Sequence, residues 1–386
     1  MEHEDPRETS SRPSNLSHML PFELLGIVFS HISEDPLDLR YAIFVCRYWH
    51  DVIVHDANLW TSIILGYTFL TRFRGARLHH GDAFVRSCLS RSSPLPLHIS
   101  IHDHKCGSLY GNTPNTDTEC FSLVKHILDV NSGEPEKFFQ RCRSLSWYPY
   151  KRLAEVNLVT QALTSASLPT LEYLTIKNLL VFKEDLVTRF PRLPQLKEVT
   201  LTDHSEICIP PLFHDEDLAK AERLSFTVTS RWLDYDVNCV RRFRSIRTLI
   251  LKETDLDDDE PYGETLHGPP EPAELPLLET LTLSGRVVHQ VLTLMRTPGL
   301  RKMEIEADMM EGRHSLVAIN LMHMVRSLEH LDVSLTEGMY VTSWVGELER
   351  LVVEAPSLVR MRVDPWMVEH LQEKEWRTGL HVTDSS

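Results

Sequence analysis

A short apolar pattern recurs nine times along the chain from residue 142 onward. Each copy has an apolar residue, two other residues, an apolar residue, one other residue and a third apolar residue, as in LPTLEYLTI at residues 168–176. Successive copies start 22 to 32 residues apart, at Cys142, Leu171, Leu196, Ala221, Ile246, Leu278, Leu300, Leu328 and Leu358. This period constrains the fold strongly, because repeats of this length bury their apolar residues only by stacking on one another.

One residue separates the last two apolar residues of each copy, which is the spacing of a short β-strand with one buried face. Amphipathic runs at residues 214–224, 285–297 and 312–327 lie between copies and predict helices. The pattern resembles leucine-rich repeats, which implies an α/β solenoid with short parallel strands on a concave side and helices on a convex side. Residues 92–101 are a candidate irregular first unit.

The resemblance is incomplete. The family often has Asn three residues after the last apolar residue of a copy, and two of these places hold Leu179 and His204 instead. A less regular α/β domain is therefore the alternative to a solenoid.

The residue between the paired apolar positions of each strand should face the concave side, where a repeat protein can hold a protein substrate. The early positions are mostly hydroxyls and the late ones are charged: Ser146, Thr175, Thr200, Ser225, Ile250, Thr282, Glu304, Asp332 and Arg362. The alternative is that Ser and Thr simply suit exposed strand positions.

The first part of the chain has a different character. Residues 1–15 are polar and charged and predict a disordered tail. Apolar residues from Leu20 to Ile32 recur at helical spacing, and Asp35 is a good N-cap for a second helix over Pro36–His55. That second helix is apolar nearly all round, with Arg40, Arg47 and Asp51 as one polar stripe, so part of its surface should meet a partner or the following domain.

This region resembles an F-box. The family pattern is met by Leu20, Pro21, Glu23, Leu24, Leu25, Phe29, Leu39, Val45, Cys46, Arg47, Trp49, Leu59 and Trp60, with Val28 and Ile32 as conservative replacements. The resemblance implies a three-helix unit that docks a Skp-type adaptor, and through it a cullin. The residues that it implies for adaptor binding and its support are Leu20, Pro21, Leu24, Leu25, Phe29, Val45, Tyr48 and Trp49.

Three groups of residues offer other chemistry. Cys46 and His50 are one helical turn apart, as a nucleophile and its base require, but packing inside the F-box-like unit explains them more simply. The set His98, His102, His104 and Cys106 has ligand types without paired zinc spacing. The acidic run at residues 255–260 lacks the glycine of a calcium loop. No catalytic, cofactor or metal site is therefore expected.

Composition limits the partners and the cellular compartment that the sequence allows. The formal net charge of −15 argues against nucleic acid as a partner. The N-terminus lacks the plan of a secretory signal, no apolar run reaches membrane-spanning length, and the seven cysteines form no CxxC pair. The sequence therefore predicts an intracellular protein of the cytoplasm, the nucleus or both, with no membrane partner.

The expected domains are a tail at 1–15, an F-box at 16–65, a linker with an irregular first repeat at 66–135, and a repeat domain at 136–386. A turn-rich segment at 102–120 and an acidic, proline-rich insertion at 252–275 interrupt the rhythm. The function that fits is a non-enzymatic substrate receptor of a cullin–RING ubiquitin ligase. The alternatives are a protein-interaction scaffold that delivers nothing for ubiquitination, and an enzyme with an unrecognised site.

Overall fold

The computed structural model describes most of the predicted strands and the helices of the F-box-like region. The described residues are 20–32, 39–66, 78–102, 139–148, 167–177, 189–202, 213–228, 240–253, 272–285, 292, 294–307, 324–335, 341–372 and 380–384. The turn-rich segment beyond residue 102, most of the acidic insertion, His104 and Cys106 lie outside them.

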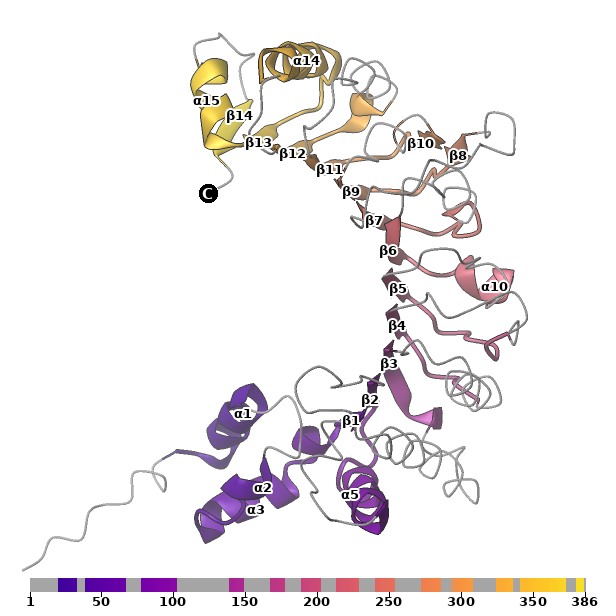
Figure 1. Cartoon of the computed structure of the whole chain (residues 1–386), viewed down its shortest axis with the longest axis vertical. Coiled ribbons are helices and arrows are strands. Elements are labelled where there is room, and N and C mark those ends of the chain that lie inside the picture. Colours follow the sequence, from indigo (N-terminus) through magenta and orange to yellow (C-terminus); the bar gives the residue numbers. More distant parts are fainter. Residues whose placement is uncertain are drawn as a thin grey trace, which may run out of the picture.

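In the described part of the chain, twelve strands form one sheet in which every neighbouring pair is parallel. Figure 1 shows these strands along the inner side of an open curve, with helices on the outer side. In spatial order the strands are β1 Ser62–Gly66, β2 Leu97–His102, β3 Cys142–Tyr148, β4 Tyr173–Lys177, β5 Glu198–Thr202, β6 Arg223–Val228, β7 Thr248–Glu253, β9 Thr280–Ser284, β11 Lys302–Ala307, β12 His330–Leu335, β13 Arg360–Val363 and β14 His381–Asp384.

The predicted mixed α/β fold with a long parallel sheet is confirmed. Each of the nine copies supplies one strand, and residues 97–102 of the irregular first unit supply β2. The edge strands β1 and β14 were not predicted, although Trp60, Ile63 and Leu65 repeat the spacing of the pattern at β1. The paired apolar residues, such as Leu174 and Ile176, are buried on one face, while the residue between them is only partly buried. The core therefore lies between the sheet and the outer layer.

The outer layer contains several helices in the part of the chain that the structure describes. Its described helices include α5 Leu78–Arg91, α10 Asp215–Leu218, the 3-10 helix η7 Val325–Ser327, α14 Val341–Glu354 and α15 Pro365–Gln372. The run at 214–224 forms only the four residues of α10, and most of the run at 312–327 lies outside the described residues. In the run at 285–297, the described residues 292 and 294 are helical, and the run ends in a strand. That strand, β10 Met295–Arg296, pairs with β8 Ala273–Glu274 in a separate small sheet.

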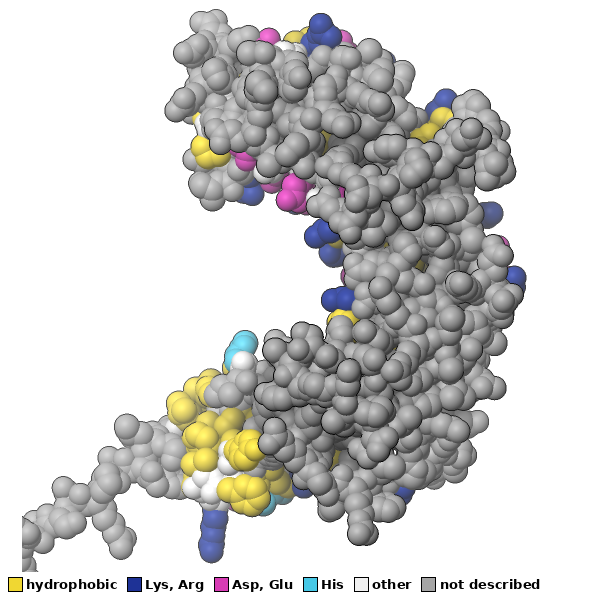
Figure 2. Space-filling model, viewed as in Figure 1, with side chains coloured by type: hydrophobic (Ala, Val, Ile, Leu, Met, Phe, Trp, Pro, Cys, Tyr) yellow, Lys and Arg dark blue, Asp and Glu magenta, His cyan; other side chains and the backbone are white. Residues whose placement is uncertain are grey.

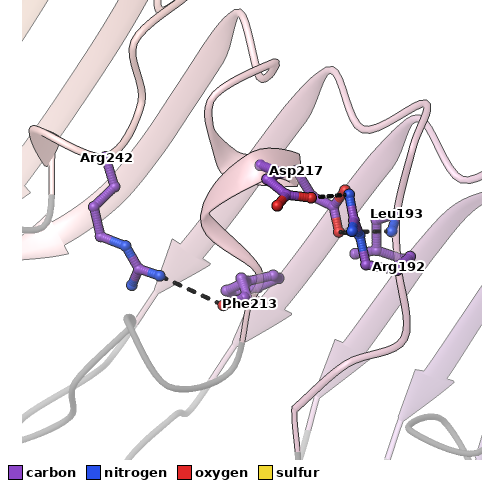
Figure 3. A network of polar contacts seen from close by, with 6 residues as sticks. Arg192, Leu193, Phe213, Asp217 and Arg242 are labelled. Carbon is purple, nitrogen blue, oxygen red and sulfur yellow. Dashed lines mark hydrogen bonds and ion pairs between the residues drawn. The ribbon is translucent and has the colours of Figure 1, made fainter.

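Buried Asp217 of α10 makes polar contacts that connect this short helix to the preceding repeat (Figure 3). Its carboxylate accepts a hydrogen bond from the backbone N–H of Leu193 at 2.9 Å, and Arg192 pairs with it at 3.3 Å. Because a buried carboxylate needs such partners, Asp217 ties α10 to the preceding repeat. Phe190 and Phe213 stack beside this contact with ring centroids 5.3 Å apart.

A row of alternating charges lies where the strands begin. We define the strand-start row as the residues aligned just before the first paired residue of each strand: Arg143, Glu172, Lys197, Glu222, Arg247, Glu279, Arg301 and Glu329. The Glu172 carboxylate pairs with Arg143 at 3.1 Å and with Lys197 at 3.0 Å. Hydrogen bonds from Lys197 and then Arg143 hold the pKa of Glu172 below its usual range. Every neighbour along this row has the opposite charge.

The sheet begins inside the segment predicted as the F-box. Strand β1 ends at Gly66 and pairs along its whole length with β2, so the proposed boundary at residue 65 does not coincide with a break in the sheet. Trp60 packs against Phe84 of α5 with ring centroids 6.4 Å apart, and the Arg91 guanidinium lies 4.3 Å from the Trp60 ring. One hydrophobic core therefore continues from the first helices into the solenoid-like part.

Arg141 lies just before β3 and connects the start of this strand to the end of α5. Its guanidinium donates to the carbonyl oxygens of Leu89, Ser92 and Leu95 at the end of α5, at 2.6 to 3.1 Å. The Ser92 carbonyl also accepts from the Leu95 N–H at 2.7 Å, and the Leu89 carbonyl from the Ser92 hydroxyl at 3.4 Å. The planar fork of Arg thereby fixes α5 against the start of the sheet.

Candidate docking surfaces

Helix α1, Phe22–Ile32, is apolar on two sides. Leu25 and Phe29 lie one turn apart, face the core and are 2% and 1% exposed. The Phe29 ring meets the Trp49 ring edge-on, with centroids 5.1 Å apart and an interplanar angle of 78°. Leu24, Ile27 and Val28 point outward and are exposed. A helix that uses one apolar side for its own core has the other available for a partner.

The predicted continuous helix over Pro36–His55 is wrong. The described part of this segment forms α2 Leu39–Ala42 and α3 Arg47–His55, which a turn at residues 43–45 separates. Cys46 has an extended backbone, with φ −159° and ψ 166°, and its sulfur accepts a hydrogen bond from the Trp49 N–H at 3.5 Å. The thiol is therefore the N-cap of α3, and the single polar stripe expected for one helix does not exist.

The break exposes large apolar side chains. Tyr41 is 69% exposed, Phe44 85% and Val45 60%. With the outer side of α1 they form what we call the apolar patch: Leu20, Phe22, Leu24, Ile27, Val28, Tyr41, Phe44 and Val45. Figure 2 shows hydrophobic side chains gathered over α1 to α3 at the lower end of the molecule. Exposed clusters of this kind on a folded protein indicate a binding site.

The residues predicted for adaptor binding divide into two groups. Leu20, Pro21, Leu24 and Val45 are exposed and available for contact. Leu25 and Phe29 are buried, so they support the patch from behind, and Tyr48 and Trp49 are half-buried. Tyr48 donates its hydroxyl to the Leu20 carbonyl at 2.7 Å and so ties α3 to the start of α1. The contact with an adaptor itself stays a prediction.

Sequence reasoning missed Phe22, Ile27, Val28, Tyr41 and Phe44 as surface residues. Ile27 had a detectable signal, because Leu24, Ile27 and Val28 repeat at helical spacing beside the buried stripe. The apolar spacing did not indicate the exposure of Tyr41 and Phe44, because this exposure follows from the break before α3.

The residues predicted for the concave face lie in one row of the sheet. The register pairs Ser146 with Thr175, then Thr200, Ser225, Ile250, Thr282, Glu304, Asp332 and Arg362, strand by strand. Ile64, Ser100 and Thr383 extend this middle row to both edges of the sheet. All nine predicted residues are partly exposed, on the face opposite the core. Substrate binding by this row stays a prediction.

The charged end of the middle row forms a connected network. Glu304 receives the Lys302 ammonium at 2.5 Å and the Thr282 hydroxyl at 2.9 Å, and its pKa lies below its usual value chiefly because of the Lys302 hydrogen bond. Asp332 lies beside it and pairs with Arg362 at 3.4 Å. Burial raises the pKa of Asp332 and the Glu304 charge adds to the effect, while Arg362 opposes it.

The middle strands carry aromatic rings beside cations. The Lys177 ammonium lies 4.8 Å from the Tyr148 ring centroid, and the Arg143 guanidinium lies 5.7 Å from that of Tyr173. Arg143 also helps to lower the pKa of His98, an effect that is mainly due to burial. These contacts place His98 among cations, which does not suit a ligand of a metal cation.

The described residues contain no group of three or more His, Cys, Asp or Glu side chains that could hold a metal ion. The His50 ring contacts Asp51 at 3.2 Å, while the Cys46 sulfur caps α3, so these two residues have separate roles. Burial raises the pKa of the Cys142 thiol to about 12, which makes it a poor nucleophile. Among the described helices, none is long and apolar enough to cross a membrane.

The model of the F-box-like family matches residues 18–65, so the chain contains an F-box-like domain there. No curated protein matches the chain. A solved structure with some likeness is the crystal structure of the Rad7 and Elc1 complex in yeast. The likeness covers 94% of this chain and 92% of that one at 14% identity, with a TM-score of 0.34, which is too low to support an argument about fold or function.

Proposed function

We propose that this protein is a non-enzymatic substrate receptor of a cullin–RING ubiquitin ligase. The F-box-like domain docks a Skp-type adaptor, and leucine-rich repeats over residues 136–386 hold a protein substrate on the concave face. The protein acts by proximity, because a bound substrate is held near a ubiquitin-loaded enzyme. The observation that carries the proposal is the apolar patch, a group of large apolar side chains that are exposed on the F-box-like domain.

The arrangement of the patch supports this role. Its exposed side chains come mainly from α1 and the turn before α3, and buried Phe29 and half-buried Trp49 hold these two elements together. A partner that covers both elements would remove Phe44, Val45 and Leu24 from water at once. Burial of large apolar side chains at the centre of an interface typically dominates binding.

Copurification with a Skp-type adaptor tests the proposal. Val45→Asp places a charge in the patch, and Val353→Asp is the matched control, because Val353 on α14 is 78% exposed and lies far along the chain. Wild type and Val353→Asp should retain the adaptor, while Val45→Asp and Leu24→Asp should lose most of it. Retention by both patch variants, or failure of the wild type to bind, would refute the proposed docking.

The scaffold alternative shares the docking step and differs afterwards. Reconstituted ubiquitination of a partner that copurifies with the full chain separates the two functions. Modification that disappears with Val45→Asp and persists with Val353→Asp is expected of a receptor. A partner that stays unmodified while the adaptor and cullin are bound indicates a scaffold.

A further inference from the structure

On the concave face, the last four strands carry one row of basic side chains and one row of acidic side chains. Two residues before the middle row, the register aligns Lys302, His330, Arg360 and His381 across β11 to β14. We call these four residues the cation row, although the formal charge counts its two histidines as neutral, and all four are exposed. The carboxylate row consists of Glu304 and Asp332 in the middle row together with Glu306 and Asp364 two residues farther along. Figure 2 shows acidic and basic side chains together on the inner surface of the upper arm.

The carboxylate row has partners within the sheet. Glu304 is bound by Lys302 and Thr282, and Asp332 is bound by Arg362. The Ser284 hydroxyl donates to Glu306 at 3.1 Å, and Ser334 donates to Asp364 at 3.3 Å. These bonds fix the carboxylates in place, but Glu304, Glu306 and Asp332 have further lone pairs for a cation from outside.

The cation row is largely unpaired. The side chains of His330, Arg360 and His381 have no hydrogen-bond or ion-pair partner among the described residues, and only Lys302 is engaged, with Glu304. The neighbouring strand-start row contributes Arg301 and Glu329, and their opposite charges cancel. Three adjacent strands therefore present free donors or protonatable groups beside fixed carboxylates.

The spacing of the two rows suits an extended peptide. Parallel strands lie about 4.8 Å apart, so the cation row spans roughly 14 Å. Two residues along a strand separate Glu304 and Asp332 from the cation row by about 6.6 Å, and four residues separate Glu306 and Asp364 from it by about 13 Å. An extended peptide directs successive side chains to opposite sides, so a segment lying across the strands can reach both rows at once.

We propose that strands β11 to β14 bind an extended polypeptide segment in which acidic and basic residues alternate. Its acidic side chains contact Arg360 and its neighbours in the cation row, and its basic side chains contact the carboxylate row. The inference rests on the proposed function, because it assigns the chemistry of the substrate that the concave face holds. Alternation also disfavours a helix in the free segment, because like charges then fall four residues apart.

Segments of one charge fit less well. An all-acidic segment would meet the carboxylate row and the overall charge of −15. An all-basic segment would meet Arg360, Arg362 and Lys302. Charge complementarity therefore favours both signs in alternation, which also provides specificity against other acidic or basic proteins.

Fluorescence anisotropy with labelled eight-residue peptides tests the inference on the full chain. The probe alternates Glu and Lys, and the comparison peptides are four Glu followed by four Lys, all Glu, and all Lys. Arg360→Glu reverses one charge of the cation row, and Arg360→Gln removes it more conservatively. Arg326→Glu is the matched control, because Arg326 is exposed in η7, outside the sheet.

The alternating peptide should bind wild type more tightly than the block peptide of equal net charge. Arg360→Glu should weaken this binding about tenfold and Arg360→Gln less, while Arg326→Glu should leave it unchanged. Equal binding of the alternating peptide and any comparison peptide would overturn the inference, as would normal binding by a folded Arg360→Glu. Adaptor copurification of the same preparations shows separately whether the proposed function holds.

Discussion

At the scale of single residues, most polar side chains with a clear role act as connectors. Cys46 caps α3, Asp217 anchors α10, and Arg141 binds the carbonyls that end α5. Cys46 and Asp217 each accept a hydrogen bond from a backbone N–H, and Arg141 donates to three backbone carbonyls. Asp332 differs from them, because burial and the nearby Glu304 disfavour its charge.

Replacement of Asp332 should change stability in a pH-dependent way. The folded-state pKa of this acid is raised, so ionisation costs stability as the pH rises above the ordinary aspartate value. Asp332→Asn should therefore raise the melting temperature slightly at neutral pH, by about 1 °C, and the gain should vanish at a pH below that ordinary value. Thermal unfolding from acidic to neutral pH measures this, and a loss of stability at pH 7 would show that the Arg362 ion pair dominates.

Replacement of Cys46 distinguishes a cap from a nucleophile. Cys46→Ser keeps a hydrogen-bond acceptor at the N-cap and should retain stability, whereas Cys46→Ala should lose about 0.5–1 kcal/mol. Urea unfolding of both variants provides the comparison. Equal stability of the two would mean that the thiol contributes nothing as a cap, and adaptor binding should survive in both.

At the scale of elements, the strands were predictable and the helices much less so. The nine copies of the pattern located nine strands and the middle row residue by residue, because a period of two fixes which side chains share a face. Edge strands β1 and β14 were not predicted, because Trp60, Ile63 and Leu65 carry the spacing inside the F-box-like segment and β14 lacks it. The break before α3 was not predictable from apolar spacing, because it depends on the extended backbone of Cys46. The domain boundaries stay predictions.

The strand-start row should help to hold the strands in register. Glu222 lies between Lys197 and Arg247, so Glu222→Lys would place three cations on adjacent strands. Like charges opposite each other destabilise a sheet, and we expect the melting temperature to fall by about 1–2 °C at low salt. In 1 M NaCl the difference should largely disappear because exposed charges are screened. Glu222→Gln should lie between wild type and Glu222→Lys, and a deficit that persists in high salt would contradict the electrostatic explanation.

At the scale of the whole molecule, the F-box-like domain and the sheet share one core. Trp60 joins them through Phe84, and β1 continues the F-box-like segment directly into the sheet. An adaptor bound to the apolar patch would therefore be held in a fixed orientation relative to the concave face (Figure 1). Fixed placement favours reaction between groups that are held close together.

Truncation tests this continuity. A chain that lacks residues 1–66 loses β1 and Trp60, exposes the edge of β2, and should unfold several degrees lower or aggregate. A chain that lacks only residues 1–15 should match the full chain. Circular dichroism melting and size-exclusion chromatography report both, and unchanged stability of the shorter fragment would show that the two parts fold independently.

Hydrogen exchange of the full chain with and without a purified Skp-type adaptor tests the central claim most directly, because it locates the contact without any substitution. The account predicts slower exchange on adaptor binding in residues 20–32 and 41–47, which carry the apolar patch, with little change in strands β4 to β13. Protection confined to the concave strands, or no protection in these two segments despite binding, would contradict the assignment of the apolar patch as the adaptor-docking surface.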